Sequence, residues 1–468
     1  MFVGAIVLLA ILYEPLVGLG MAILLGLLKA FVSVELPQFA AFYPGQIFFF
    51  IALGSWALRG LARRKFSFPH VPTNRALLAF AFIATLSLWS AADLENGLKE
   101  VIKWFEMAIT AVLVVDAIRR RNVGWVIAMV LFAGSVQAAV GVWQFGLRGS
   151  GPDHFEIQPG FYRAYGSFEQ PNPFGGFMGL VWPIAAGIVI ALILNFRSET
   201  GKWRQKSPFS NLWFSIIFIC LLFSAGLTLL ALVLSFSRGA WLGAAAAGWV
   251  LLVFWPRRRL TGLALGIAAI LVFLLALRSG ALPDSVSARL AAVDEFVQVY
   301  DVRGAYFEEE NFSLIERIAH WQVAISMASA NPWLGVGIGN WDAGYSEFQL
   351  INWPASLGHA HNIYLNMLAE IGFLGLTVYL FLWISVAINS WRAAAATTGW
   401  PRGLAIGLLG VWTHLAVHQL VDNLFVNNLH FYIGTLFGLL AWLLKLRIPT
   451  QSEETEFLRN EQIASISA

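Results

Sequence analysis

The chain has 468 residues, of which 58% are hydrophobic and only 12% are charged. A soluble globular domain carries roughly 25% charged residues, so this composition excludes an ordinary soluble protein and indicates a polytopic membrane protein. The formal net charge of +3 does not suggest a nucleic-acid partner, and the single cysteine, Cys220, excludes an intrachain disulfide and a cysteine-based metal site.

Apolar runs long enough to cross a bilayer recur along the chain, and a span needs about 20 mostly apolar residues. That length predicts about twelve spans, at residues 3–33, 44–61, 75–92, 101–118, 123–146, 174–196, 211–235, 239–255, 260–278, 361–390, 402–421 and 428–446. Glu14-Pro15 interrupts the first run, where proline breaks the helical hydrogen-bond ladder. We count this run as one long broken element, which is either one kinked helix or two helices. The first run lacks a basic flank and a cleavage site, so we expect a retained span.

Basic residues gather in alternate connections between these runs. The basic connections hold Arg59, Arg63, Arg64 and Lys65; Arg119, Arg120 and Arg121; Arg197, Lys202, Arg204 and Lys206; Arg257, Arg258 and Arg259; and Arg392 and Arg402. The positive-inside rule places these connections in the cytoplasm. We therefore expect both termini in the cytoplasm, with a polar, disordered tail at 448–468.

The same alternation places residues 147–173, the turn at 235–239, a long loop at 279–358 and the link at 422–427 on the outer side of the membrane. The long loop holds ten acidic and three basic residues, and a connection of this length is usually functional. Apolar residues at helical spacing predict a helix over Phe312–Ala330, which Asn331-Pro332 ends. We therefore divide the chain into three predicted regions: N-terminal spans at 1–160, a catalytic region at 161–447 that includes the loop, and the tail at 448–468.

Three arginines fall on the predicted outer side. Arg238 stands between two apolar runs with almost no loop, Arg317 lies at the start of the loop helix, and Arg163 lies in the 147–173 connection. Arginine binds phosphate through two parallel hydrogen bonds and stays charged, so two or three arginines at one cavity suit a diphosphate. The alternative is that each extends to lipid headgroups or pairs with a loop acid. The tight turn makes that alternative weakest for Arg238.

His361 stands where the long loop meets the next apolar run. A histidine with an ordinary pKa near 6.5 can take a proton from an incoming hydroxyl, and the alternative is a polar residue bonded to the helix start. His359 precedes it and has a supporting role. His414, His418 and Asp422 are spaced by four, so they share one helix face. We favour a buried packing stripe for that face over a metal site, with Asp422 reaching the cavity.

A resemblance rests on motifs that occur in order over residues 160–440. They are Gly166-Ser167-Phe168 with Pro171-Asn172, Ser237-Arg238-Gly239, Glu316-Arg317-Ile318-Ala319-His320-Trp321, Asn331-Pro332-Trp333-Leu334-Gly335-Val336-Gly337, and His361-Asn362 followed by Gly372 and Gly375. The set resembles the O-antigen ligase/O-antigen polymerase superfamily of bacterial membrane glycosyltransferases. That resemblance implies an all-α, GT-C-like fold in the bacterial inner membrane.

The resemblance also implies a glycan donor on undecaprenyl diphosphate and transfer to an acceptor sugar hydroxyl, without a metal or another cofactor. His361 would be the general base, with Asn362 in support, and Arg238 and Arg317 would bind the diphosphate. A ligase, a polymerase with a lipid-linked acceptor and a protein-glycosylating relative share this donor, so all three remain open. A transporter of lipid-linked glycan and a structural assembly subunit are the alternatives outside this family. The absence of a nucleotide-binding motif argues against an ATP-driven pump.

Overall fold

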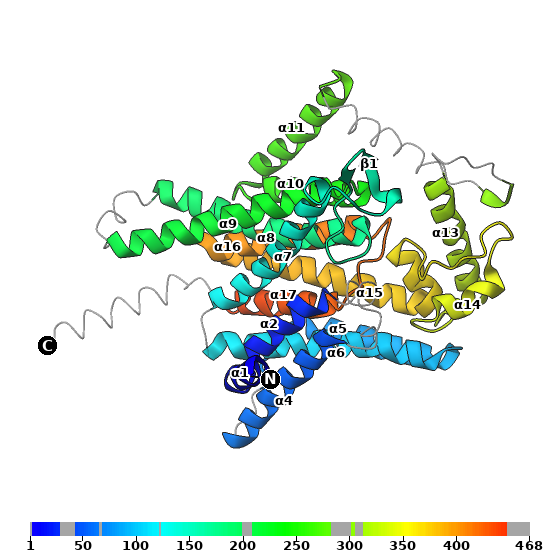
Figure 1. The fold of residues 1–468 in the computed structure, drawn as a ribbon, viewed down its shortest axis with the longest axis horizontal. Helices are drawn as coiled ribbons and strands as arrows, with labels where there is room; N and C mark the ends of the chain where they lie inside the picture. Colours follow the sequence, from blue (N-terminus) through cyan, green and yellow to red (C-terminus); the bar gives the residue numbers. More distant parts are fainter. Residues whose placement is uncertain are drawn as a thin grey trace.

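The computed structural model describes residues 2–28, 43–64, 68–120, 123–198, 208–281, 301–304 and 312–446. The predicted tail at 448–468 and much of the first half of the long loop lie outside the described residues. The described part is a bundle of helices with a smaller helical unit at one end, formed by α13 (Phe312–Ala330) and α14 (Trp341–Phe348) (Figure 1). We call this end of the bundle the loop end.

The other described α-helices are α1 (Phe2–Tyr13), α2 (Pro15–Gly26), α4 (Pro44–Ala62), α5 (Asn74–Ser87), α6 (Leu94–Arg120), α7 (Val123–Gly146), α8 (Pro171–Ser198), α9 (Pro208–Leu234), α10 (Arg238–Phe254), α11 (Arg259–Arg278), α15 (Ile363–Ala396), α16 (Gly399–His418) and α17 (Leu429–Leu443). Strands β1 (Glu156–Gln158) and β2 (Phe161–Tyr162) pair antiparallel. This small hairpin is the one described departure from the predicted all-α fold.

Each predicted span coincides with a helix, but only some of these helices have the length and apolarity of a complete crossing. Among the described residues six do: Pro44–Ala62, Val123–Gly146, Pro171–Leu194, Leu212–Leu234, Arg259–Arg278 and Ile363–Ala396. The molecule is therefore a membrane protein, and the count of twelve stays a prediction. The first predicted span is two helices, because Pro15 is the first residue of α2 and ends the hydrogen-bond ladder of α1 at Glu14.

Small residues bring α8, α10 and α16 into close contact at the centre of the bundle. A Cβ atom at Gly187 of α8 would lie 2.3 Å from the carbonyl oxygen of Gly403 of α16. A Cβ atom at Gly243 of α10 would lie 2.7 Å from the His414 ring of α16. Small residues at such contacts let membrane helices pack backbone to backbone. The packing holds the loop ends of these three helices together.

Helix α15 is broken at Gly372, whose φ of 64° and ψ of −169° are not helical. The segment that follows α13 lies against this break: the Phe373 N–H donates to the Pro332 carbonyl at 2.8 Å, and the Gly337 N–H donates to the Glu370 carbonyl at 2.8 Å. A Cβ atom at Gly372 would lie 2.3 Å from the Trp333 carbonyl carbon. The helix that coincides with the predicted span at 361–390 is therefore kinked at Gly372, and its turns before the break contact the loop-end unit.

The loop-end unit has its own small core. Val323, Ala324 and Met327 of α13 pack with Trp341 and Tyr345 of α14 and with residues that flank or begin α15. The helix predicted over Phe312–Ala330 is confirmed. Glu370, on the last turn of α15 before the break, accepts hydrogen bonds from the Gly339 and Trp341 N–H groups, each at 3.0 Å. Its carboxyl group thus joins the loop-end unit to the first turns of α15.

Candidate functional site

A cavity of about 180 Å³ lies where α8, α10, α13 and α16 meet at the loop end. It is lined by Arg163, Asn172, Phe236, Ser237, Arg238, Gly239, Arg317, His418, Val421 and Asp422. The three arginines that the sequence singled out therefore share one cavity with a single carboxylate, that of Asp422. Because positive side chains outnumber negative ones three to one, the cavity favours an anion.

Local structure explains how each arginine reaches the cavity. Arg238 is the first residue of α10, held there by Phe236, which adopts a φ of 50°, and by Ser237, whose hydroxyl accepts from the Ala240 N–H at 3.4 Å. Arg163 donates from Nε to the Ser235 carbonyl at 2.9 Å. Arg317 lies on the second turn of α13. Three separate chain segments thus supply the positive charge.

Arg163 also donates from Nη2 to Asn172 Oδ1 at 3.1 Å, and Asn172 is the second residue of α8. The cavity is therefore lined by first-turn residues of two long helices, α8 and α10. Helix N-termini present unpaired N–H groups and the positive end of the helix dipole. The dipoles of both helices add to the attraction of the arginines for an anion, although Pro171 and Pro173 leave the first turn of α8 with few N–H groups.

His361 and His359 lie beside this cavity, next to Asp422. The His361 N–H donates to His359 Nδ1 at 2.9 Å, and His359 Nε2 lies 3.9 Å from Asp422 Oδ1. Since Nδ1 accepts, a neutral His359 carries its proton on Nε2, toward the Asp422 carboxylate. The carboxylate thus orients His359, and the backbone of His361 is fixed through His359.

Asn362 has a local structural role as the N-cap of α15. Its Oδ1 accepts from the Tyr364 N–H at 3.0 Å and from the Leu365 N–H at 3.1 Å. Immediately before the cap, His361 adopts a φ of 51°, which is unusual for a residue other than glycine. Strained backbone of this kind gathers at functional sites.

His361 differs from the sequence-based expectation in its pKa. Burial, followed by the neighbouring His359 and Arg317, lowers the pKa of His361 from 6.5 to about 2. Burial also lowers the pKa of His359. The His361 ring is thus neutral at physiological pH, and its Nε2 is buried without a hydrogen-bond partner. A neutral imidazole with an unpaired nitrogen can accept a proton from a hydroxyl that enters the site.

His359, His361 and Asp422 each offer one ligand atom, all within 4.8 Å of one another. That spacing alone suits a divalent cation. Two charges act on the group in opposite directions: Arg317 opposes added positive charge at both histidines, whereas the Asp422 carboxylate favours it at His359.

The sequence did not reveal the places of His418 and His320. His418, interpreted above as part of a packing stripe, lines the cavity. His414 does fit the interpretation as a packing residue, because it packs against Gly179 and Gly243. His320 of α13 lies with its ring centre 5.5 Å from that of His361. The only sequence signals were the spacing of His418 from Asp422 and the position of His320 three residues after Arg317.

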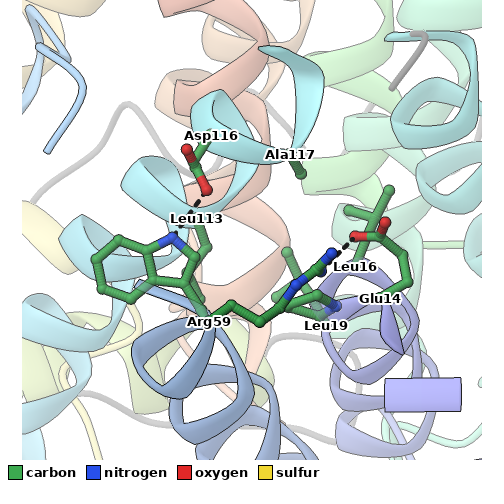
Figure 2. A pocket seen from close by; sticks show the side chains of 9 residues that line it. Glu14, Leu16, Leu19, Arg59, Leu113, Asp116 and Ala117 are labelled. Atoms are coloured by element: carbon green, nitrogen blue, oxygen red, sulfur yellow. Dashed lines mark hydrogen bonds and ion pairs between the residues drawn. The ribbon is translucent and has the colours of Figure 1, made fainter. Parts of the chain in front are cut away.

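A second pocket lies between α2, α4 and α6 (Figure 2). Arg59 Nη1 lies 3.9 Å from Glu14 Oε1, and the Trp56 Nε1–H donates to Asp116 Oδ2 at 2.9 Å. The accessible space is only about 10 Å³, room for no more than a water molecule. We call it the balanced pocket, because its arginine is matched by carboxylates.

Comparison with known proteins supports the resemblance found in the sequence. Residues 223–380 match the family model described as O-antigen ligase. The matched segment contains Arg238, Arg317 and His361, together with Gly372 at the break in α15. No curated protein matches the chain.

Proposed function

We propose that this chain, whose residues 223–380 match the O-antigen ligase family model, transfers a glycan from undecaprenyl diphosphate to a sugar hydroxyl of an acceptor. The observation that carries this proposal is the cavity that joins three arginines, beside a buried neutral histidine. A lipid diphosphate requires positive charge that stays fixed, and a hydroxyl nucleophile requires a base. Both requirements are met within one site.

The arginines bind the diphosphate and stabilise it as the leaving group. Negative charge grows on the diphosphate as its bond to the sugar breaks, so Arg238 and Arg317 act most strongly in the transition state. Arg163 supports them, since its contacts to Ser235 and Asn172 hold its guanidinium at the cavity wall. The first turns of α8 and α10 add to the same field.

His361 Nε2 accepts the proton of the acceptor hydroxyl as the oxygen attacks the anomeric carbon. The bond from that carbon to the diphosphate oxygen breaks, and the electron pair leaves with the diphosphate. A bound diphosphate brings negative charge that offsets Arg317, so the pKa of His361 rises in the complex and the imidazole becomes a better base. His359, oriented by Asp422, holds the main chain of His361 in place.

The site belongs on the outer side of the bacterial inner membrane in this proposal. The arginine-rich connections predicted from the sequence then face the cytoplasm, together with both termini. Residues 161–447 form the catalytic region, and the GT-C-like bundle carries it. A ligase and a polymerase use the same donor site, so the acceptor distinguishes them: a glycolipid core for a ligase, a second lipid-linked glycan for a polymerase.

The decisive experiment compares His361→Ala and Arg238→Ala with the wild type in transfer of glycan from undecaprenyl diphosphate by the purified protein. We expect each variant to lose transfer by roughly 100-fold or more. His70→Ala, at an exposed histidine far along the chain from Arg163 and the site motifs, is the control and keeps wild-type transfer. Wild-type activity in both site variants at equal protein levels would refute the proposal. Offering a glycolipid core and a lipid-linked glycan separately then identifies the acceptor.

A further inference from the structure

His418 lines the arginine cavity from the end of α16, and none of the steps above uses it. Its side chain is fully buried, and neither ring nitrogen makes a well-formed hydrogen bond within the protein. The main chain of Asn172 is close enough to interact with the ring, but it can engage only one nitrogen. At least one buried ring nitrogen is therefore left without a protein partner.

Such a group is costly to bury unless a ligand completes its hydrogen bonding, because the ring loses its bonds to water on folding. The chain nevertheless provides a dedicated space for it. A Cβ atom at Gly176 of α8 would lie 2.8 Å from His418 Cε1, and one at Gly239 of α10 would lie 3.6 Å from Cδ2. Any larger residue at Gly176 would displace the ring.

The ring is also held from below, since His414 stacks on it with 5.7 Å between ring centres and 17° between planes. Glycines on two helices and a histidine one turn earlier thus fix the ring in an arginine-lined cavity. His414 also has both ring nitrogens without a hydrogen-bond partner, but it does not line the cavity. The open nitrogen of His418 differs because it lies at an arginine-lined cavity that attracts an anion.

We propose that His418 is a diphosphate-binding residue that donates a ring N–H to a phosphate oxygen at the bottom of the arginine cavity. This inference rests on the proposed function, because it assigns His418 to the site that binds the donor. The arginines supply charge, which attracts any anion from many directions. An imidazole N–H supplies one directional contact, so His418 sets where a phosphate stops in the cavity.

The test measures binding of farnesyl diphosphate and of inorganic pyrophosphate to the purified protein in detergent. We expect His418→Leu to weaken binding of both probes by roughly 10-fold or more. His418→Gln, which restores an N–H donor, should return affinity to within about 3-fold of the wild type. An equal penalty for both probes places the contact on the diphosphate, whereas a penalty confined to farnesyl diphosphate overturns the proposal.

His414→Leu is the matched control, because His414 is buried on the same helix face but does not line the cavity. We expect it to bind both probes as the wild type does. Equal weakening by His414→Leu and His418→Leu would mean that the effect is packing, which overturns the inference. Unchanged binding in His418→Leu overturns the inference alone. A wild-type protein that binds neither probe overturns the proposed diphosphate site as well.

Discussion

Two pockets of the molecule place arginine beside carboxylates, and they lie at opposite ends of the bundle. Asp93, just before α6, contacts the loop-end residue Asn340, so Asp116 in the balanced pocket lies more than six helical turns away. In the balanced pocket Arg59 pairs with Glu14, Asp116 accepts from Trp56, and almost no space remains. In the cavity three arginines face one aspartate across about 180 Å³.

The two pockets differ in what their arginines do: one arginine stabilises the fold, and the others are available to bind a ligand. A buried arginine that meets carboxylates of its own chain has its electrostatic needs met by the fold. Where arginines outnumber the carboxylates that line an open cavity, a positive potential remains that a bound anion can offset. On this reasoning, substitutions in the cavity should alter function with little loss of stability, and substitutions in the balanced pocket should do the reverse.

The largest effect should come from Arg317→Gln in the cavity. We expect kcat/KM for glycan transfer to fall by roughly 100- to 1,000-fold, because one positive charge on the leaving group is lost. Arg317→Lys should recover only part of the activity, since an ammonium lacks the two-pronged geometry. Arg303→Gln is the control, because Arg303 is exposed and paired with Asp301. A fall of less than about 3-fold in Arg317→Gln would remove the distinction between the two pockets.

A second large effect is expected at the break in α15. In Gly372→Ala the new Cβ atom meets the Trp333 main chain in a backbone conformation that alanine rarely adopts. We expect a loss of about 3 kcal/mol or more in the free energy of unfolding, seen as reduced thermal stability and reduced transfer together. Gly54→Ala, at an exposed helical position with open space around it, should leave stability unchanged or slightly raised. A fully stable Gly372→Ala protein would contradict the described break.

The balanced pocket should respond in stability alone. Arg59→Gln removes the Arg59–Glu14 ion pair, and we expect a loss of about 1–2 kcal/mol in the free energy of unfolding, reduced because the pair is 3.9 Å apart and partly exposed. The melting temperature in detergent should fall by roughly 2–4 °C, while transfer per folded molecule stays at the wild-type level. Loss of transfer without loss of stability would show that this pocket also serves the reaction.

The smallest effect concerns pH. Because the pKa of His361 is lowered from 6.5 to about 2, the free enzyme keeps its base neutral, and kcat/KM should stay flat from pH 8 to about pH 5.5. In the unfolded chain the same histidine takes up a proton below about pH 6.5, whereas the folded chain keeps it neutral. The free energy of unfolding therefore falls as the pH drops below about 6.5. Half-loss of kcat/KM near pH 6.5 would show that His361 is exposed in the working enzyme.

The features that could be predicted from the sequence are those that depend on composition and local pattern. Apolar runs located the helices, and helical spacing predicted α13 with its end at Asn331-Pro332. The motifs singled out Arg163, Arg238, Arg317, His361 and Asp422, which the fold brings to one place. Side-chain environments were beyond that reasoning, because they depend on neighbours from other helices. The lowered pKa of His361 and the open nitrogen of His418 both arise from such contacts.

The bonds of Glu370 have a mechanical consequence for a protein that works within a bilayer. They join the loop-end unit to the first turns of α15, so His361 and Arg317 are carried by one packed body instead of by two independently floating helices. A change in membrane thickness would tilt or shift the spans below the break at Gly372. The spacing between His361 and Arg317 would not follow that change, because α13 and the start of α15 move as a unit.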